Sequence, residues 1–160
     1  DLPDTMAPLV IMYNEDIPTS QMGTIYRAAD CFVLPTRGEG WCLPALEAMG
    51  CGLPVIATDW GGLTEFNRAD PASGFDGPVS YPLRVREEIL AMARCNYYPG
   101  FRWADPDFDH LVELMRYVYQ HQDEAREVGA RAAKYAAANW TWKHAAQKII
   151  KRLEAIEALS

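Results

Sequence analysis

Short apolar runs alternate along the chain with segments of helical spacing. Three runs are apolar throughout, which is typical of strands buried on both faces of a sheet: Leu9–Tyr13, Cys31–Leu34 and Pro54–Ala57. The segments between them favour helices, one after Pro18 and one over Leu43–Met49. This order predicts a parallel sheet with right-handed crossovers, and ligands of such sheets bind at the carboxyl ends of the strands.

The chain changes character near residue 105. Proline and glycine interrupt residues 67–104, where one further strand is expected near Val79–Tyr81. Residues 105–160 have helical spacing throughout and form the helical part of the same domain, which we expect to span 1–160. The predicted fold class is α/β, a Rossmann-like parallel sheet with flanking helices. Helix caps are expected at Asp105, Asp123 and Thr141.

Apolar side chains recur at helical spacing in each of the three C-terminal segments, which predicts that each buries one face. The tryptophans beside the last helix are likewise expected in the core. The stripes are Phe108, Leu111, Val112, Met115, Val118 and Tyr119; then Val128, Ala132, Tyr135 and Ala136; then Trp142, Ala145, Ile149, Ile150, Leu153 and Ile156, with Trp140 preceding them.

Composition and charge disfavour two classes of binding partner, nucleic acids and the interior of a membrane. The chain has 160 residues, with 15 Lys and Arg against 22 Asp and Glu, and its net charge of −7 disfavours nucleic acid as a partner. No apolar run approaches the roughly 20 residues of a membrane-spanning helix, so no transmembrane segment is expected. The chain opens on Asp1 without a signal-like start, which suggests a piece truncated at its N-terminus.

Cysteine spacing points to a reducing compartment. The four cysteines form no C-x-x-C pair and no dense framework, so we expect reduced thiols and a cytoplasmic location. They are Cys31, Cys42, Cys51 and Cys95.

The stretch from Gly38 to Glu47 carries the candidate chemistry. A glycine-rich exit from a strand leads into a helix whose first amides have no partner inside the helix, an arrangement suited to an anion. Glu39 and Glu47 are eight residues apart, and both can face one cleft. A carboxylate accepts from two hydroxyls at once, which suits a vicinal diol. The plainer interpretation makes both residues solvated surface acids. No dinucleotide fingerprint or P-loop occurs.

The residues from Phe32 to Thr58, followed by Gly61, Gly62 and Glu65, resemble the donor-binding domain of retaining group 1 (family 4) glycosyltransferases. Glu39 and Glu47 match the E-x7-E pattern of that family. The resemblance implies the C-terminal domain of a GT-B architecture, which holds a nucleoside-diphosphate sugar. It also implies a partner, the missing N-terminal domain of the same enzyme, which holds the acceptor.

The resemblance further implies a role for each site residue. Glu39, the catalytic candidate, would contact the transferred sugar near the reacting carbon, and Glu47 would accept from the ribose hydroxyls. The remaining substrate-binding candidates are Arg37, Gly40, Trp41, Cys42, Leu43, Gly61 and Gly62, with the amides of residues 41–43 facing the diphosphate. Cys42 departs from the family, which usually has glycine there, and its β-carbon disfavours a positive φ.

No metal or other cofactor is expected. Asp105, Asp107 and Asp109 form a D-x-D-x-D run that lacks the glycine and glutamate of a calcium-binding loop, so we interpret them as acids at a helix start. The three histidines lack the spacing of a zinc site.

Two other functions compete with glycosyl transfer from a nucleotide sugar to a saccharide or lipid-linked acceptor. One is a non-catalytic domain that binds a nucleotide sugar or serves as a scaffold. The other is a phosphorylase-like enzyme that uses orthophosphate, since related folds share the anion-binding helix. The sequence does not distinguish the donor base, the sugar or the acceptor.

Overall fold

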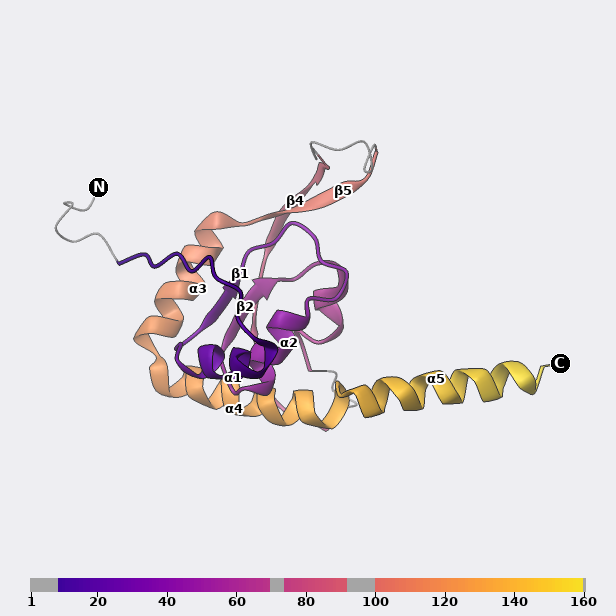
Figure 1. Ribbon diagram of the computed structural model, residues 1–160. Helices are drawn as coiled ribbons and strands as arrows, with labels where there is room; N and C mark the ends of the chain where they lie inside the picture. Colours follow the sequence, from indigo (N-terminus) through magenta and orange to yellow (C-terminus); the bar gives the residue numbers. More distant parts are fainter. Residues whose placement is uncertain (1–8, 70–73, 92–99, 160) are drawn as a thin grey trace.

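A three-stranded parallel sheet lies at the centre of the protein (Figure 1). The computed structural model describes residues 9–69, 74–91 and 100–159. The middle strand is buried along its whole length, as its apolar residues Val55–Ala57 predict. In spatial order the strands are β1 (Phe32–Leu34), β2 (Val55–Thr58) and β3 (Tyr81–Leu83). The predicted α/β class is confirmed, and the further strand begins two residues later than expected.

Helices cover both faces of this sheet. Alternation along β2 directs Val55 and Ala57 into the core formed with α2 and the second half of α4, while Ile56 packs with α3 on the other face. The helix after Pro18 and the one predicted over Leu43–Met49 are both present. The helices are α1 (Thr19–Arg27), α2 (Leu43–Gly50), α3 (Phe108–Gln120), α4 (Gln122–Asn139) and α5 (Trp142–Glu157), and a 3-10 helix, η2, spans Gly61–Glu65.

The contact between α2 and α4 is unusually close at one point. Gly129 of α4 faces the turn that follows α2, and a β-carbon at this position would overlap the carbonyl of Gly52. Ala132, Tyr135 and Ala136 extend the same contact and are buried, as their helical spacing predicts. The absence of a side chain at residue 129 therefore lets α4 lie directly against the end of α2.

An antiparallel pair of strands, β4 (Val85–Leu90) and β5 (Arg102–Pro106), projects from the sheet. The sequence analysis did not anticipate this pair, and its expectation that Asp105 caps a helix is wrong. Asp105 lies inside β5, where its carboxylate forms an ion pair with Arg86. The cap of α3 is Asp107, whose carboxylate accepts from the amide of His110 at 3.1 Å. These contacts give partners to the carboxylates of Asp105 and Asp107.

The remaining helix starts are partly as expected. Thr141 caps α5 through a capping box with His144, as predicted. Asp123 does not cap α4, because that helix already begins at Gln122; Asp123 lies in its first turn and pairs with Arg126. A carboxylate in the first turn is still favoured by the helix dipole.

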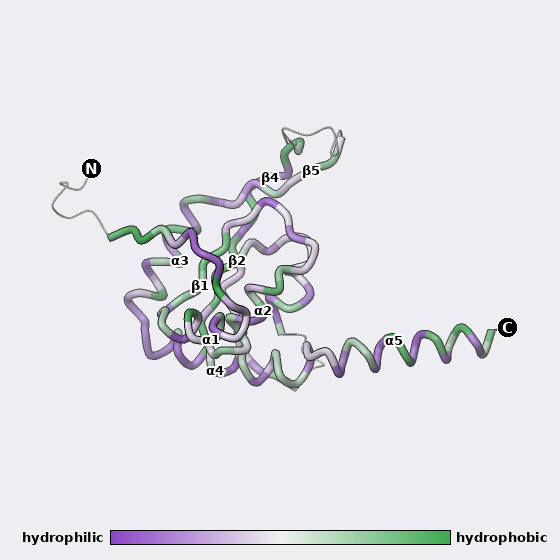
Figure 2. The backbone as a smooth tube through the Cα atoms, viewed as in Figure 1, coloured by the Kyte–Doolittle hydropathy of each residue, from purple (hydrophilic) through white to green (hydrophobic). Residues whose placement is uncertain are grey.

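The apolar run Leu9–Tyr13 is not a strand. It extends from the body of the protein, and its side chains are 64–86% exposed. Figure 2 shows it as a continuous apolar stretch. An apolar run forms a stable strand only when it hydrogen-bonds to a neighbouring strand. Within the described residues β1 pairs only with β2, so Leu9–Tyr13 has no such neighbour.

Helix α5 also departs from expectation. It extends away from the body (Figure 1), and none of its residues is buried. Its apolar stripe is therefore exposed, and Trp142 is 83% exposed, so the expectation that it lies in the core is wrong. Trp140, just before the helix, is half-buried and packs against the core. The stripe of α3 is mixed: Val118 is buried, and other positions are open to solvent. The open α3 positions are Phe108, Met115 and Tyr119.

No helix within the described ranges is long and apolar enough to span a membrane. The cysteines described, Cys31, Cys42 and Cys51, are free thiols. Cys95 lies outside the described residues.

Candidate functional site

The loop between β1 and α2 lies against the start of η2. The amide of Gly62 donates to the carbonyl of Glu39 at 3.1 Å. A β-carbon on Gly61 would lie 2.8 Å from that same carbonyl, and one on Gly62 would overlap the carbonyl of Gly40. Gly61 also has a positive φ of 63°. Two glycines are therefore required here, because any side chain would separate the two loops.

The carboxylate of Glu39 is held within its own loop. The residue is half-buried, and the hydroxyl of Thr36 donates to its Oε1 at 3.3 Å. Within the described part of the chain, no cation forms an ion pair with it. An acid placed in this way at the carboxyl end of the sheet is available to a ligand.

Helix α2 begins with an unusual backbone conformation. Its N-cap, Cys42, has φ 67° and ψ 69°, the left-handed region, although it carries a β-carbon. Burial raises the pKa of its thiol above the ordinary value. The amides of Trp41, Cys42 and Leu43 find no backbone acceptor among the residues described, and Pro44 contributes no amide. The tip of α2 therefore presents free donors and the positive end of the helix dipole.

Glu47 lies one turn along α2 from these amides. It is exposed, and the hydroxyl of Tyr26 in α1 donates to its Oε2 at 3.0 Å. Burial, and secondarily this hydrogen bond, raise the pKa of Tyr26 to about 12. The phenol therefore remains a proton donor across the physiological range, and it fixes one oxygen of Glu47 while the other stays available.

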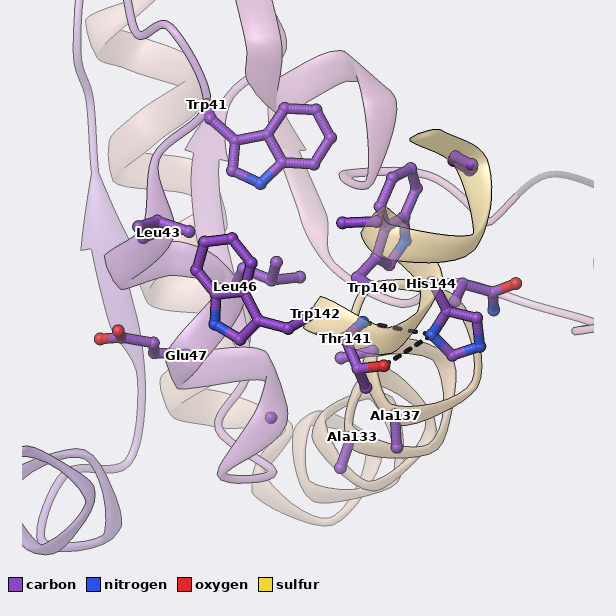
Figure 3. Close-up of a pocket in the computed structure, with 15 residues that line it drawn as sticks. Trp41, Leu43, Leu46, Glu47, Ala133, Ala137, Trp140, Thr141, Trp142 and His144 are labelled. Carbon is purple, nitrogen blue, oxygen red and sulfur yellow. Dashed lines mark hydrogen bonds between the residues drawn. The ribbon is translucent and has the colours of Figure 1, made fainter. Parts of the chain in front are cut away.

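A cavity of about 600 Å³ adjoins Glu47 (Figure 3). One wall is the outer face of α2, with Leu43, Leu46 and Glu47, and the opposite wall is the end of α4 and the start of α5. Most of this lining is apolar. Trp41, Trp140 and Trp142 all border the cavity.

The structure divides the predicted site residues into two groups. Glu39, Gly40, Gly61 and Gly62 come together at the two loops, whereas Trp41, Leu43 and Glu47 line the cavity. Cys42 lies between the groups at the start of α2. Arg37 is exposed, and its guanidinium has no ion-pair partner in the described ranges; its carbonyl accepts from the amide of Ala104 at 2.9 Å.

Three neighbours of this site were not identified from the sequence as site residues. Tyr26 is 21 positions from Glu47, so no local pattern could link the two. Trp142 and Lys148 come from α5, which the sequence placed against the core. Lys148 lies with its Nζ 4.8 Å from the centroid of Trp140. In the sequence, Trp142 belongs to the apolar stripe of α5 and looks like a core residue. Its exposure is seen only in the structure.

Solved structures share this fold. Sucrose-phosphate synthase from Thermosynechococcus elongatus matches 93% of the chain with a TM-score of 0.65 and 22% identity, and the chain covers 31% of that protein. The catalytic domain of starch synthase IV from Arabidopsis thaliana, bound to ADP and acarbose, matches 89% with a TM-score of 0.54 and 17% identity, covering 24% of that chain. The fold is therefore that of a GT-B glycosyltransferase domain.

Sequence comparison finds similarity to one family of glycosyltransferases. The family model for glycosyl transferases group 1 matches residues 9–80. D-inositol 3-phosphate glycosyltransferases of Mycobacterium tuberculosis and Mycobacterium bovis are 29% identical over 131 residues, which is 82% of this chain. The chain spans 22% of the length of those relatives. Over these residues the chain is similar to the group 1 glycosyltransferases, as its motif from Phe32 to Thr58 predicts.

Proposed function

We propose that this chain is the donor-binding part of a retaining glycosyltransferase. The enzyme moves a sugar from a nucleoside diphosphate to a saccharide or lipid-linked acceptor. The observation that carries the proposal is the outer face of α2, where free amides at the helix tip and the exposed carboxylate of Glu47 lie one turn apart. The homology to group 1 glycosyltransferases supports the reaction class.

The parts of a nucleotide sugar match this arrangement in order. The diphosphate binds the amides of residues 41–43, and the ribose hydroxyls donate to the free oxygen of Glu47. The transferred sugar lies beside Glu39 at the loop that Gly61 and Gly62 support. Negative charge develops on the diphosphate as the glycosidic bond breaks, and fixed amides at a helix tip stabilise it with no need for a metal.

One solved neighbour supports the class of ligand. The starch synthase IV structure contains ADP, a nucleoside diphosphate. The acceptor, in our proposal, binds a further domain of the same enzyme, since the matched relatives are several times longer than this chain. Complete transfer accordingly needs residues beyond these 160.

Calorimetric titration with UDP, GDP, ADP and their sugars tests the proposal. We expect Glu47→Ala to weaken nucleoside diphosphate binding by about 1–3 kcal/mol, the usual cost of removing a charged hydrogen-bond partner. Glu113→Ala is the control, because this exposed acid lies on α3, away from the α2 face. Unchanged affinity in a folded Glu47→Ala variant would remove the ribose assignment.

A further inference from the structure

The loop that carries Glu39 is held by a strand far from it in the sequence. The amide of Ala104 in β5 donates to the carbonyl of Arg37 at 2.9 Å, and Ala104 is fully buried. The β4–β5 pair starts at the carboxyl end of the sheet, because β4 begins directly beyond the end of β3 (Figure 1). The loop after β1 leaves the sheet at this same end, so the strand pair and the loop meet there.

Trp103 brings β5 to the loop at a second point. A β-carbon placed on Gly38 would lie 3.7 Å from Cδ1 of Trp103, and among the described residues no other atom beyond the chain neighbours lies within 4 Å of it. Trp103 is half-buried and stands opposite Ile89 of β4, so the two side chains share one face of the strand pair. The indole therefore lies next to the residue that precedes Glu39.

The carboxylate of Glu39 is linked to this part of the backbone through Thr36. The amide of Gly38 donates to Oγ1 of Thr36 at 3.4 Å, and the same hydroxyl donates to Oε1 of Glu39 at 3.3 Å. Arg37 and Gly38, which adjoin β5, lie between Thr36 and Glu39 in the chain. A displacement of these two residues would therefore move both ends of the link that holds the carboxylate.

The base of the β4–β5 pair is fixed to the body of the protein. The amide of Asp107 donates to the carbonyl of Arg84 at 2.9 Å, and Nε of Arg84 donates to the Asp107 carboxylate at 2.9 Å. The amide of Arg84 also donates to Nδ1 of His110 in α3 at 3.0 Å. Exposed ion pairs contribute little by themselves, so the bonds that involve backbone give most of this anchoring. An indole has few rotatable bonds, and on an anchored strand it forms a stiff support.

We propose that Trp103 is a positioning residue for sugar transfer, which holds residues 36–38 so that the carboxylate of Glu39 faces the reacting sugar. The inference rests on the proposed function, because it takes Glu39 as the residue that contacts the transferred sugar. Trp103 acts through the loop. The nucleoside diphosphate binds the tip of α2 in that proposal, so removing the indole lowers turnover and leaves nucleotide affinity nearly unchanged.

A double-mutant cycle in the complete enzyme tests this inference, with whichever of the UDP, GDP and ADP sugars the enzyme turns over. We expect Trp103→Ala to lower kcat about tenfold or more, since a small misplacement of a catalytic group is costly. Calorimetric affinity for the nucleoside diphosphate changes less than about twofold. Trp103→Phe restores most of kcat, because a ring remains beside Gly38. Combined with Glu39→Gln, Trp103→Ala causes no further loss, since its effect passes through that carboxylate.

Leu90→Ala is the matched control, because this apolar side chain of the same strand pair is 60% exposed and stands opposite Arg102, farther from the loop than Trp103. We expect this control to keep full kcat. If Trp103→Ala unfolds the strand pair, Trp103→Leu, which keeps an apolar side chain, takes its place in the cycle. Circular dichroism of each variant checks the fold.

The outcomes separate this inference from the proposed function. Unchanged kcat in Trp103→Ala, an equal loss of nucleotide affinity, or losses that multiply in the double variant would each overturn the positioning role. If Glu39→Gln alone still lowers kcat, the proposed function stands in all three cases. Full activity in Glu39→Gln, or no turnover of any of the three classes of nucleotide sugar by the complete enzyme, would overturn both.

Discussion

Cys42 takes a backbone conformation that glycine adopts without cost. Its φ of 67° is the only positive value outside glycine in the described ranges. A β-carbon in the left-handed region costs roughly 1–2 kcal/mol. This backbone conformation sets the direction of the amides at the tip of α2, and it is one that glycine would adopt without strain.

Cys42 therefore offers a direct test of that strain. We expect Cys42→Val to lower the free energy of unfolding by about 2 kcal/mol relative to Cys42→Ala, because a β-branched residue fits the left-handed region worst. Chemical denaturation measures the difference. The alanine variant controls for the loss of the buried thiol, and equal stabilities would show that the loop relaxes to a negative φ.

Glu39 tests the catalytic part of the proposal. In the complete enzyme, Glu39→Gln should lower kcat about a hundredfold while changing nucleotide affinity little, since its proposed partner is the sugar at the reacting carbon. Glutamine can still accept the hydrogen bond of Thr36, so the loop is preserved. Steady-state kinetics beside nucleotide titration separates the two effects. Full activity in this variant would favour a binding or scaffold role instead.

At the scale of elements, the contact between α4 and α2 sets the shape of the site. Gly129 allows α4 to approach the carbonyl of Gly52, and this approach brings the end of α4 to the cavity beside Glu47. Alanine normally stabilises a helix relative to glycine, by roughly 0.5–1 kcal/mol. At this position the overlap with backbone outweighs that gain.

Gly129→Ala should accordingly destabilise the protein by about 1–3 kcal/mol, the usual cost of overpacking. Gly50→Ala is its control, because this helical glycine has no atom within 4 Å of an added β-carbon. Thermal unfolding of both variants checks the expectation. A stabilised Gly129→Ala variant would mean that α4 shifts freely along α2.

The elements that the sequence predicted correctly are those with strong local patterns. β2 begins with the apolar run Val55–Ala57, and α2 has Pro44 in its first turn, so both lie within one residue of their predicted bounds. The pair β4–β5 was missed because three consecutive charged residues, Arg86, Glu87 and Glu88, interrupt the apolar pattern of β4. Leu9–Tyr13 has the pattern of a strand, but pairing depends on neighbours and not on pattern alone.

In the candidate site, too, local patterns predicted some features and tertiary packing determined the others. The loop from Gly38 and the helix that follows were predicted from the sequence. The structure brings the backbone of Glu39 to Gly61 and Gly62, since both loops lie at the carboxyl edge of the sheet. The hydrogen bond between Tyr26 and Glu47, and the position of Trp142 beside α2, arise from tertiary packing. No local pattern encodes such contacts.

At the scale of the whole molecule, our proposal makes this chain one side of a larger reaction site. Given that it spans 22% of the matched relatives, we expect the isolated chain to bind donor and to transfer no sugar. Radiolabelled transfer from UDP, GDP and ADP sugars, assayed with the isolated chain and with the complete enzyme as reference, measures this. Turnover by the isolated chain would contradict the assignment of the acceptor side to another domain.

The open side of β1 has a consequence for handling the protein. Within the described ranges no second strand pairs with β1, and the same molecule carries an exposed apolar segment and an exposed apolar stripe on α5. Sheet edges of this kind recruit strands from neighbouring molecules. In concentrated solution the isolated chain should therefore self-associate reversibly. Light scattering over a dilution series will measure its average mass at each concentration.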